Sequence, residues 1–385
     1  MERWDVWTEG AILWPVIVGE DRILPRVADI AASVGPAGQG AGLVDIPLLD
    51  IGRDGPVALA EHAADRLAIL VASARRHYGG VTLHLGDRAT HQWLLRNGNP
   101  YRHEIAAIAA RFPVPGAIVL NLSYEWSCTA GVGPDPDRQG MRMLRTLDWP
   151  LKGLGASLVV ARYETDAGEY YSATWPGFVG VLTATAPGRF CAAINQPPAR
   201  RISGRCWFDW AIHRRGVWRQ SALPPSHLLR KVFDECRSYA EAKARLIETP
   251  LCIPAFFTLA GADSEGCVIE RQELRAAVHE APMSISNHWL SLPISGYHDR
   301  GTDSVGRRAL MDACRDSVPD GFSWVVPPIL NPKTHASVVA NAHSAKLLLQ
   351  GWEAARPVTA VFDLQERLHG ESSRTRAAPK SAASA

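Results

Sequence analysis

The sequence predicts an α+β fold in which β-sheets pack against layers of helices. Three observations support this prediction. Apolar residues recur at helical spacing in the first third of the 385-residue chain, strand-like runs follow residue 128, and helical patterns return between the later strands. We expect a mostly helical N-terminal segment over residues 1–127 and a sheet-rich body over residues 128–370. Residues 371–385, rich in Ser, Ala and Arg, are predicted to be a disordered tail.

The first predicted helix begins at Asp54-Gly-Pro56, because proline fits the first turn of a helix, and its apolar face continues to about His77. A second helix is predicted across His103–Arg111. Prolines 113 and 115 end that helix, and Ala117–Leu122 is expected to be a strand-like run that leads into the segment before Cys128.

Turn residues and alternating apolar runs predict several strands after Cys128, including a hairpin around Ala186-Pro-Gly188. The predicted strands are Ser157–Tyr163, Tyr170–Thr174, Phe178–Thr185, Arg189–Ile194, Ile253–Leu259 and Cys267–Arg271. Three helices are predicted among them: Leu228–Cys236, a helix that begins with the capping box Ser238-Tyr-Ala-Glu241, and a helix from about Asp303 to Cys314.

Composition excludes several classes of function. A net charge of +2 gives no electrostatic reason to expect nucleic acid or an anionic membrane as a partner. No apolar run reaches the length of a transmembrane helix, so stable membrane insertion is not expected. The start, Met1-Glu-Arg-Trp-Asp, lacks the pattern of a secretory signal, which predicts a cytoplasmic protein. The seven cysteines contain no Cys-x-x-Cys pair and the histidines form no ligand set, so neither metal nor cofactor is expected.

Cys128 is the candidate nucleophile. It ends an apolar run and precedes small, strand-prone residues, and Arg145-Thr-Leu-Asp148 follows seventeen residues later. A cysteine at a new N-terminus joins a nucleophilic thiol to an α-amine, whose pKa of about 7.7–8 suits a general base. Arg145 could stabilise the thiolate, and Asp148 could orient the amine. The alternative is a core cysteine near a surface ion pair.

Strand geometry adds a condition to this hypothesis. If residues 143–149 form one strand, Arg145 and Asp148 face opposite sides of it. Both side chains then reach Cys128 only if the strand bends or ends between them.

Further motifs follow in order and together carry a family resemblance. Trp175-Pro-Gly-Phe-Val-Gly-Val-Leu-Thr183 is followed by an Ala-Pro-Gly turn and a strand that ends at Asn195. With Cys128-Thr-Ala-Gly-Val and Arg145-Thr-Leu-Asp148, this order resembles the acid ceramidase family and its close relatives, the N-acylethanolamine-hydrolysing acid amidases. The resemblance runs from about residue 100 to residue 345.

The resemblance implies a four-layer αββα fold of the N-terminal-nucleophile hydrolases and self-cleavage between Ser127 and Cys128. The N-terminal fragment is expected to stay associated after the cut. The expected activity is hydrolysis of a linear amide, namely a small-molecule N-acyl amine with an apolar acyl chain, through a thioester. An acyltransferase that uses the same cysteine and a non-catalytic protein that binds lipid-like amides remain as alternatives.

The resemblance also implies roles for individual residues. Cys128 would be nucleophile, base through its amine, and agent of self-cleavage, while Arg145 would polarise the thiol and Asp148 would hold the amine. Asn195 matches the family position that donates to the tetrahedral oxyanion. The predicted site is completed by Asn287, in a segment that lies by the nucleophile, and by Arg307, with Arg300 as the rival arginine.

The chain departs from the family pattern at the cut and at the pocket rim. Thr129-Ala-Gly replaces Thr-Ser-Ile, and Asn195 is followed by Gln-Pro-Pro rather than Glu-Arg-Phe. Residues 1–100 have no clear match. The identity of the amide therefore stays open.

Overall fold

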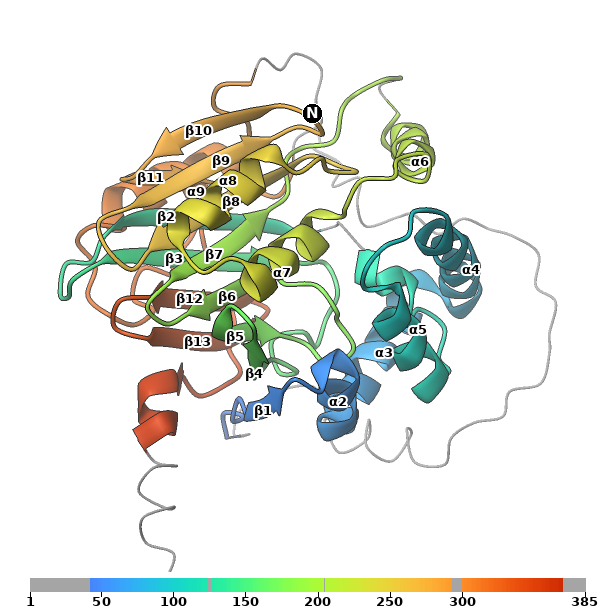
Figure 1. The fold of residues 1–385 in the computed structure, drawn as a ribbon, viewed down its shortest axis with the longest axis horizontal. Helices are drawn as coiled ribbons and strands as arrows, with labels where there is room; N and C mark the ends of the chain where they lie inside the picture. The colour runs from blue at the N-terminus through green and yellow to red at the C-terminus, as the bar shows by residue number, and fades with distance from the viewer. Residues whose placement is uncertain (1–41, 123–125, 204, 293–299, 370–385) are drawn as a thin grey trace, which may run out of the picture.

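The computed structural model describes residues 42–122, 126–203, 205–292 and 300–369 (Figure 1). Two β-sheets lie face to face, and helices cover their outer surfaces, which is the predicted four-layer αββα arrangement. The predicted fold class is therefore confirmed. None of the described helices is both long and apolar enough to cross a membrane.

Within the described residues, the larger sheet has eight strands in the order β1-β4-β5-β6-β7-β8-β9-β10. Their bounds are β1 Leu48–Gly52, β4 Val159–Thr165, β5 Gly168–Thr174, β6 Thr183–Ala186, β7 Phe190–Asn195, β8 Ala255–Gly261, β9 Gly266–Arg271 and β10 Ala276–Glu280. All its pairings are antiparallel except that of β1 with β4, which is parallel.

The second sheet has the order β11-β2-β3-β12-β13-β14, with β15 also paired to β13. Its strands are β11 Met283–Ile285, β2 Ser127–Pro134, β3 Met141–Asp148, β12 Thr334–Asn341, β13 Lys346–Glu353, β14 Arg356–Pro357 and β15 Phe362–Asp363. Cys128 is the second residue of β2, so the candidate nucleophile lies at the beginning of a central strand.

Three apolar layers hold the sandwich together. Between the sheets, alternate residues of β2 and β3 such as Val132 and Met143 pack against strands of the larger sheet. Helices α7 (Pro225–Glu235) and α8 (Tyr239–Glu248) cover the outer face of the larger sheet. Helix α9 (Ser304–Cys314) covers the other outer face, where Met311 packs with residues of β3 and β12.

The described part of the N-terminal segment, residues 42–122, is mostly helical, and it also joins the larger sheet through β1. Its helices are α2 Gly55–His62, α3 Ala64–Tyr78, α4 Gly80–Arg96 and α5 Arg102–Arg111. They gather at one end of the sandwich, and α6 (Cys206–Val217) lies nearby (Figure 1). The helix expected from Asp54 to His77 is divided at Ala63, whose backbone leaves the helical region.

The strand predicted over Ala117–Leu122 is wrong, because Val119–Leu122 forms a 3₁₀-helix. The carboxylate of Asp87 accepts hydrogen bonds from the main-chain N–H groups of Gly116, Ile118 and Val119, which draws this segment into a tight turn. Apolar composition suggested a strand, but a distant carboxylate determines the backbone.

The other predicted elements lie close to observed ones, with one shortening. The Phe178–Thr185 run is a strand only from Thr183, because the earlier residues bond elsewhere: Val181 N–H donates to the Ser226 carbonyl at the start of α7. The predicted N-cap is confirmed, since the Ser238 hydroxyl accepts from the Glu241 N–H, while the Glu241 carboxylate accepts from the Arg237 N–H. The tail over 371–385 lies outside the described residues.

Candidate active site

Cys128 is fully buried between the two sheets. It pairs with Leu147 across β2 and β3, and Arg145 pairs with Ala130 two residues further along. Because side chains alternate along a strand, Cys128 and Arg145 point to the same inner face. The Arg145 Nη2 atom donates to the Cys128 Sγ atom at 3.3 Å.

Arg145 is itself fixed by the larger sheet. Its Nη2 atom also donates to the Ile194 carbonyl at 3.1 Å, and its Nη1 atom donates to the Thr183 hydroxyl. The guanidinium therefore bridges the two sheets at the sulfur. Neither Thr183 nor the Ile194 carbonyl was predicted as a partner, although both belong to the motif blocks quoted above.

Burial raises the pKa of the Cys128 thiol above its ordinary value. The charge and hydrogen bond of Arg145 oppose this effect, Asp148 adds to it, and Arg307 opposes it more weakly. Burial prevails, so the continuous chain favours the thiol over the thiolate. Arg145 provides the largest stabilisation of the thiolate, as its predicted role requires.

Asp148 lies at the last position of β3 and faces the outer surface of the sheet, toward α9. The prediction that Arg145 and Asp148 face opposite sides is confirmed by this arrangement. Both carboxylate oxygens accept hydrogen bonds: Oδ1 from the Thr334 hydroxyl at 2.8 Å and Oδ2 from the Asn331 amide at 2.9 Å. The Arg307 Nη1 atom lies 3.6 Å from Oδ2.

Arg307 and Asn287 contact the main chain of Cys128. The Cys128 N–H donates to Asn287 Oδ1 at 3.0 Å, and Arg307 Nη2 donates to the same oxygen at 2.8 Å. Arg307 Nη1 also donates to the Cys128 carbonyl at 2.8 Å and to the Thr129 hydroxyl at 2.9 Å. The main-chain nitrogen that self-cleavage would convert into an amine is thus held by Asn287, and Arg307 holds both the Asn287 side chain and the Cys128 carbonyl.

Asn195 is buried at the end of β7, next to the segment that carries Asn287. Its amide N–H group donates to the carbonyls of Ile285 and Ser286 at 3.2 and 3.1 Å. Its Oδ1 atom has no hydrogen-bond partner among the described residues. In the continuous chain Asn195 supports the Asn287 segment, and its role as an oxyanion donor stays a prediction.

The two rival arginines occupy different places. Arg307 contacts Cys128 itself, whereas Arg300 Nη1 donates at 3.4 Å to the carbonyl of Trp126, two residues before Cys128. The structure therefore brings Arg307 to the nucleophile and Arg300 to the segment preceding the predicted cut.

Asn331 and Thr334 were missed by the sequence analysis. They contact Asp148 because β12 pairs with β3, with a register shift between Thr334 and Ala336 at the end of the ladder. The only signal in the sequence is the polar turn Asn331-Pro-Lys-Thr334 before an apolar run, and this pattern does not say which strand lies beside it.

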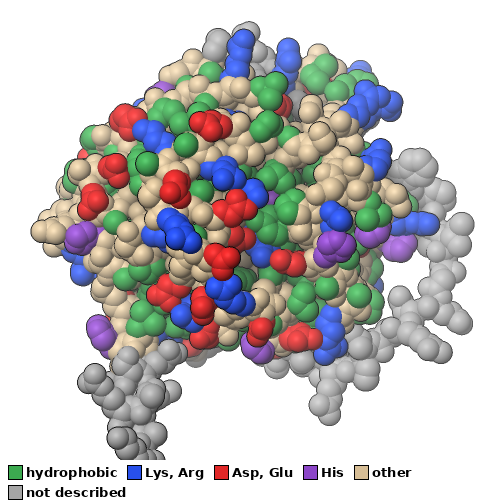
Figure 2. Space-filling model, in the orientation of Figure 1, with side chains coloured by type: hydrophobic (Ala, Val, Ile, Leu, Met, Phe, Trp, Pro, Cys, Tyr) green, Lys and Arg blue, Asp and Glu red, His purple; other side chains and the backbone are tan. Residues whose placement is uncertain are grey.

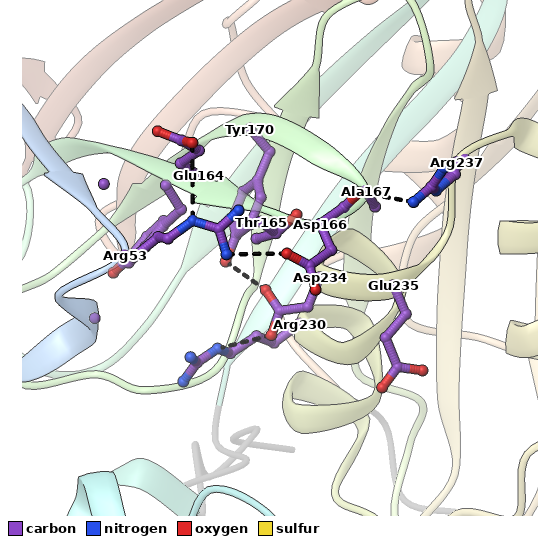
Figure 3. A pocket seen from close by; sticks show the side chains of 13 residues that line it. Arg53, Glu164, Thr165, Asp166, Ala167, Tyr170, Arg230, Asp234, Glu235 and Arg237 are labelled. Atoms are coloured by element: carbon purple, nitrogen blue, oxygen red, sulfur yellow. Dashed lines mark hydrogen bonds and ion pairs between the residues drawn. The ribbon is translucent and has the colours of Figure 1, made fainter.

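A cavity of about 480 Å³ lies away from Cys128, between the β4–β5 hairpin, the end of β1 and α7 (Figure 3). Four of its charged side chains form two ion pairs, Arg53 with Asp166 and Arg230 with Asp234. None of its lining residues belongs to the predicted site. On the face shown in Figure 2, basic and acidic side chains are interspersed, without a large surface of one sign.

A second, smaller apolar cavity has a volume of about 90 Å³. Residues of α3 and α5 line it together with Trp149 and Trp175. Trp149 directly follows Asp148, and its ring lies 5.3 Å from that of Trp126. Among the described residues, no group of three or more His, Cys, Asp or Glu side chains is arranged to hold a metal ion.

Comparison with known proteins gives the following similarities. No protein-family model matches the chain. It is 28% identical to acid ceramidase of Bos taurus over 214 residues, which cover 50% of this chain and 52% of that protein. It is 27% identical to the probable acid ceramidase of Caenorhabditis elegans over 217 residues, with the same two shares. The chain thus spans about half the length of the curated relatives that it matches.

Among solved structures, the chain is similar to the Caenorhabditis elegans N-acylethanolamine-hydrolyzing acid amidase ortholog. The TM-score is 0.44 at 21% sequence identity, and the match covers 56% of this chain and 93% of that one.

Proposed function

Because this chain is similar in sequence to the acid ceramidases, as its motifs predicted, we propose that it is a self-processing cysteine amidase. Its reaction is the hydrolysis of a carbon–nitrogen bond in a linear N-acyl amide, with Cys128 as the nucleophile. The single observation that carries the proposal is the contact set of Cys128. Its thiol accepts from Arg145, and its main-chain nitrogen donates to Asn287.

Self-cleavage is the first step of the proposed mechanism. The Cys128 sulfur attacks the Ser127 carbonyl carbon, the Ser127–Cys128 carbon–nitrogen bond breaks, and the thiol proton goes to the departing nitrogen. Water then hydrolyses the resulting thioester, which leaves a carboxylate on Ser127 and a free thiol and amine on Cys128. Asn287 and Arg307 already hold the nitrogen and the carbonyl of Cys128, so the new amine forms among groups that orient it.

In the mature enzyme the amine of Cys128 takes the thiol proton, and the sulfur attacks the substrate carbonyl. The same amine delivers the proton to the leaving amine, and water hydrolyses the acyl thioester. Arg145 favours the thiolate. Asp148, held by Thr334 and Asn331, lies 3.6 Å from Arg307 Nη1, which contacts the Cys128 carbonyl.

We propose that the N-terminal fragment stays bound after the cut. Strand β1 pairs with β4 within the larger sheet, and residues of α3, α4 and α5 belong to the same apolar core as Cys128. Polar contacts also cross the cut: both Nη atoms of Arg230 donate to the Glu104 carboxylate, and the Tyr101 hydroxyl donates to Asp234 at 3.2 Å. Breaking one peptide bond leaves all of these contacts in place.

The proposed substrate has an apolar acyl chain, ceramide-like or N-acylethanolamine-like. Support comes from the apolar cavity lined by Trp149, a residue that belongs to the same apolar core as Cys128. The acid ceramidase similarity supports the same class. The cytoplasmic location expected from the sequence stays a prediction, and subcellular fractionation would check it.

Intact-mass spectrometry tests the proposal. The wild-type chain should convert into two fragments, the larger beginning at Cys128, and the Cys128→Ala variant should remain whole. The cleaved protein should then release the acid from N-acyl amides of differing chain length. A wild-type chain that stays whole across the pH range would refute self-processing. Turnover that forms only a new amide when a competing amine is added would indicate an acyltransferase instead.

A thiol-directed active-site probe separates the amidase from a binding protein. The probe should label Cys128 in the folded, cleaved protein. If Cys128 stays unlabelled while lipid-like amides still bind, the non-catalytic alternative is supported.

A further inference from the structure

The loop Arg300–Thr302 touches each of the last two residues before the predicted cut. Arg300 Nη1 donates to the Trp126 carbonyl at 3.4 Å. Gly301 packs against Ser127, and the Thr302 carbonyl accepts from Arg307 Nε at 2.7 Å. The loop therefore connects the carbonyl side of the Ser127–Cys128 bond to the arginine that holds its nitrogen side.

The backbone of Gly301 lies so close to Ser127 and Arg307 that a side chain has no room there. A Cβ atom at position 301 would lie 2.8 Å from the Ser127 Cβ atom, 2.9 Å from its Oγ atom and 2.7 Å from Nη2 of Arg307. The backbone at Gly301 also has φ of +69°, a conformation that favours glycine. No larger residue fits here unless Ser127 or Arg307 moves.

We propose that the loop Arg300–Thr302 holds the carbonyl side of the scissile bond for self-cleavage, with Arg300 and Gly301 as positioning residues for that step only. This inference rests on the self-processing proposed above. The proposal also assigns a different role to each of the two arginines. Arg307 contacts Cys128 and remains at the site after the cut, whereas Arg300 contacts a residue that then belongs to a free chain end.

The geometry of the step explains why such a support is needed. The Cys128 sulfur must reach the carbonyl carbon of the preceding residue, the Ser127–Cys128 bond must break, and the thiol proton must reach the leaving nitrogen. Asn287 and Arg307 fix only the cysteine side of this bond. On the other side of the bond, Arg300 contacts the Trp126 carbonyl and Gly301 packs against Ser127, so both residues can orient the Ser127 carbonyl.

A double-mutant cycle tests the Gly301 contact. Wild type, Gly301→Ala, Ser127→Gly and the double variant are made by cell-free synthesis and sampled over time by intact-mass spectrometry. Gly301→Ala should slow cleavage about 10²-fold, because it displaces the scissile carbonyl. The double variant should recover the part of that loss that arises at Ser127, while the contact of the new Cβ atom with Arg307 Nη2 stays the same in both chains that carry Gly301→Ala. The two chains that carry Gly301→Ala have the same backbone strain, so their difference measures the Ser127 contact.

Arg300 gives an independent test. Arg300→Ala should cleave about tenfold more slowly, the effect of losing one hydrogen bond, and Arg300→Lys should cleave faster than Arg300→Ala because it keeps a donor. Amide turnover per cleaved Arg300→Ala molecule should equal that of wild type. Cleavage at the wild-type rate in both Gly301→Ala and Arg300→Ala would overturn the inference, as would a parallel loss of turnover per cleaved molecule. A wild-type chain that never cleaves would overturn the proposed function and this inference with it.

Discussion

Replacing Arg145 with methionine should slow self-cleavage by a calculable amount. Methionine keeps an unbranched side chain of similar reach but removes the charge and the donor that lies 3.3 Å from the Cys128 sulfur. The pKa of the Cys128 thiol is already raised by burial, and Arg145 is the leading influence that lowers it. The substitution should therefore raise that pKa further.

The magnitude follows from the hydrogen bond that is lost. A hydrogen bond to a charged group contributes about 1.5–3 kcal/mol, which corresponds to roughly a 10- to 100-fold smaller thiolate population at neutral pH. Self-cleavage should slow by the same factor if the thiolate is the attacking species. As pH rises, the thiol ionises in both proteins, so the difference should narrow. The rate profile of the variant is thus displaced toward alkaline pH.

The assay is the rate of conversion of the full-length chain, followed by intact-mass spectrometry across neutral and alkaline pH. Arg142→Met is the matched control. Arg142 lies on the same strand and is equally buried, but it faces α9 and donates to the carbonyls of Val318 and Arg315. Equal cleavage in wild type and Arg145→Met, or equal slowing in both variants, would refute this reasoning.

Three further outcomes are expected. Thr334→Val should slow self-cleavage about tenfold, because it removes a hydrogen-bond donor to Asp148. Thr334→Ser keeps the hydroxyl and should keep most of the wild-type rate. Intact-mass spectrometry over time would measure both rates. Burial lowers the pKa of His227 from 6.5 to about 3, so the unfolded chain binds more protons between these values. The free energy of unfolding should therefore fall by up to about 1.4 kcal/mol per pH unit as pH drops through this range. In the His227→Asn variant, unfolding free energies measured with urea at several pH values should depend less steeply on pH. After cleavage, Arg230→Met should release the N-terminal fragment at a lower urea concentration than wild type, because the paired carboxylate of Glu104 loses its partner.

The sequence predicted the fold where local patterns determine structure. Strand alternation predicted correctly that Arg145 and Asp148 face opposite sides of β3. The capping box predicted the start of α8. The same local reasoning failed at Ala117–Leu122, where Asp87, thirty residues earlier, determines the backbone.

The parts of the site that could not be predicted depend on pairing between distant segments. Asn331 and Thr334 reach Asp148 through the register of β12 on β3, more than 180 residues away in sequence. Strand β1 could not be assigned either, because its partner β4 lies beyond four helices. A sequence pattern indicates that a segment can pair, but the complementary surface of the folded chain determines its partner.

Self-processing would use both the thiol and the main-chain nitrogen of Cys128, and these two groups have different neighbours on β2 and β3. Its side chain points inward, where burial disfavours the thiolate and Arg145 counteracts that effect. Its main-chain nitrogen and carbonyl are reached by Asn287 and by Arg307, a residue of the outer helix α9, on the side where Asp148 lies. A thiol and an amine of one residue can therefore be tuned by different neighbours. Placing the nucleophile one residue earlier or later on β2 would reverse its face and separate the sulfur from Arg145.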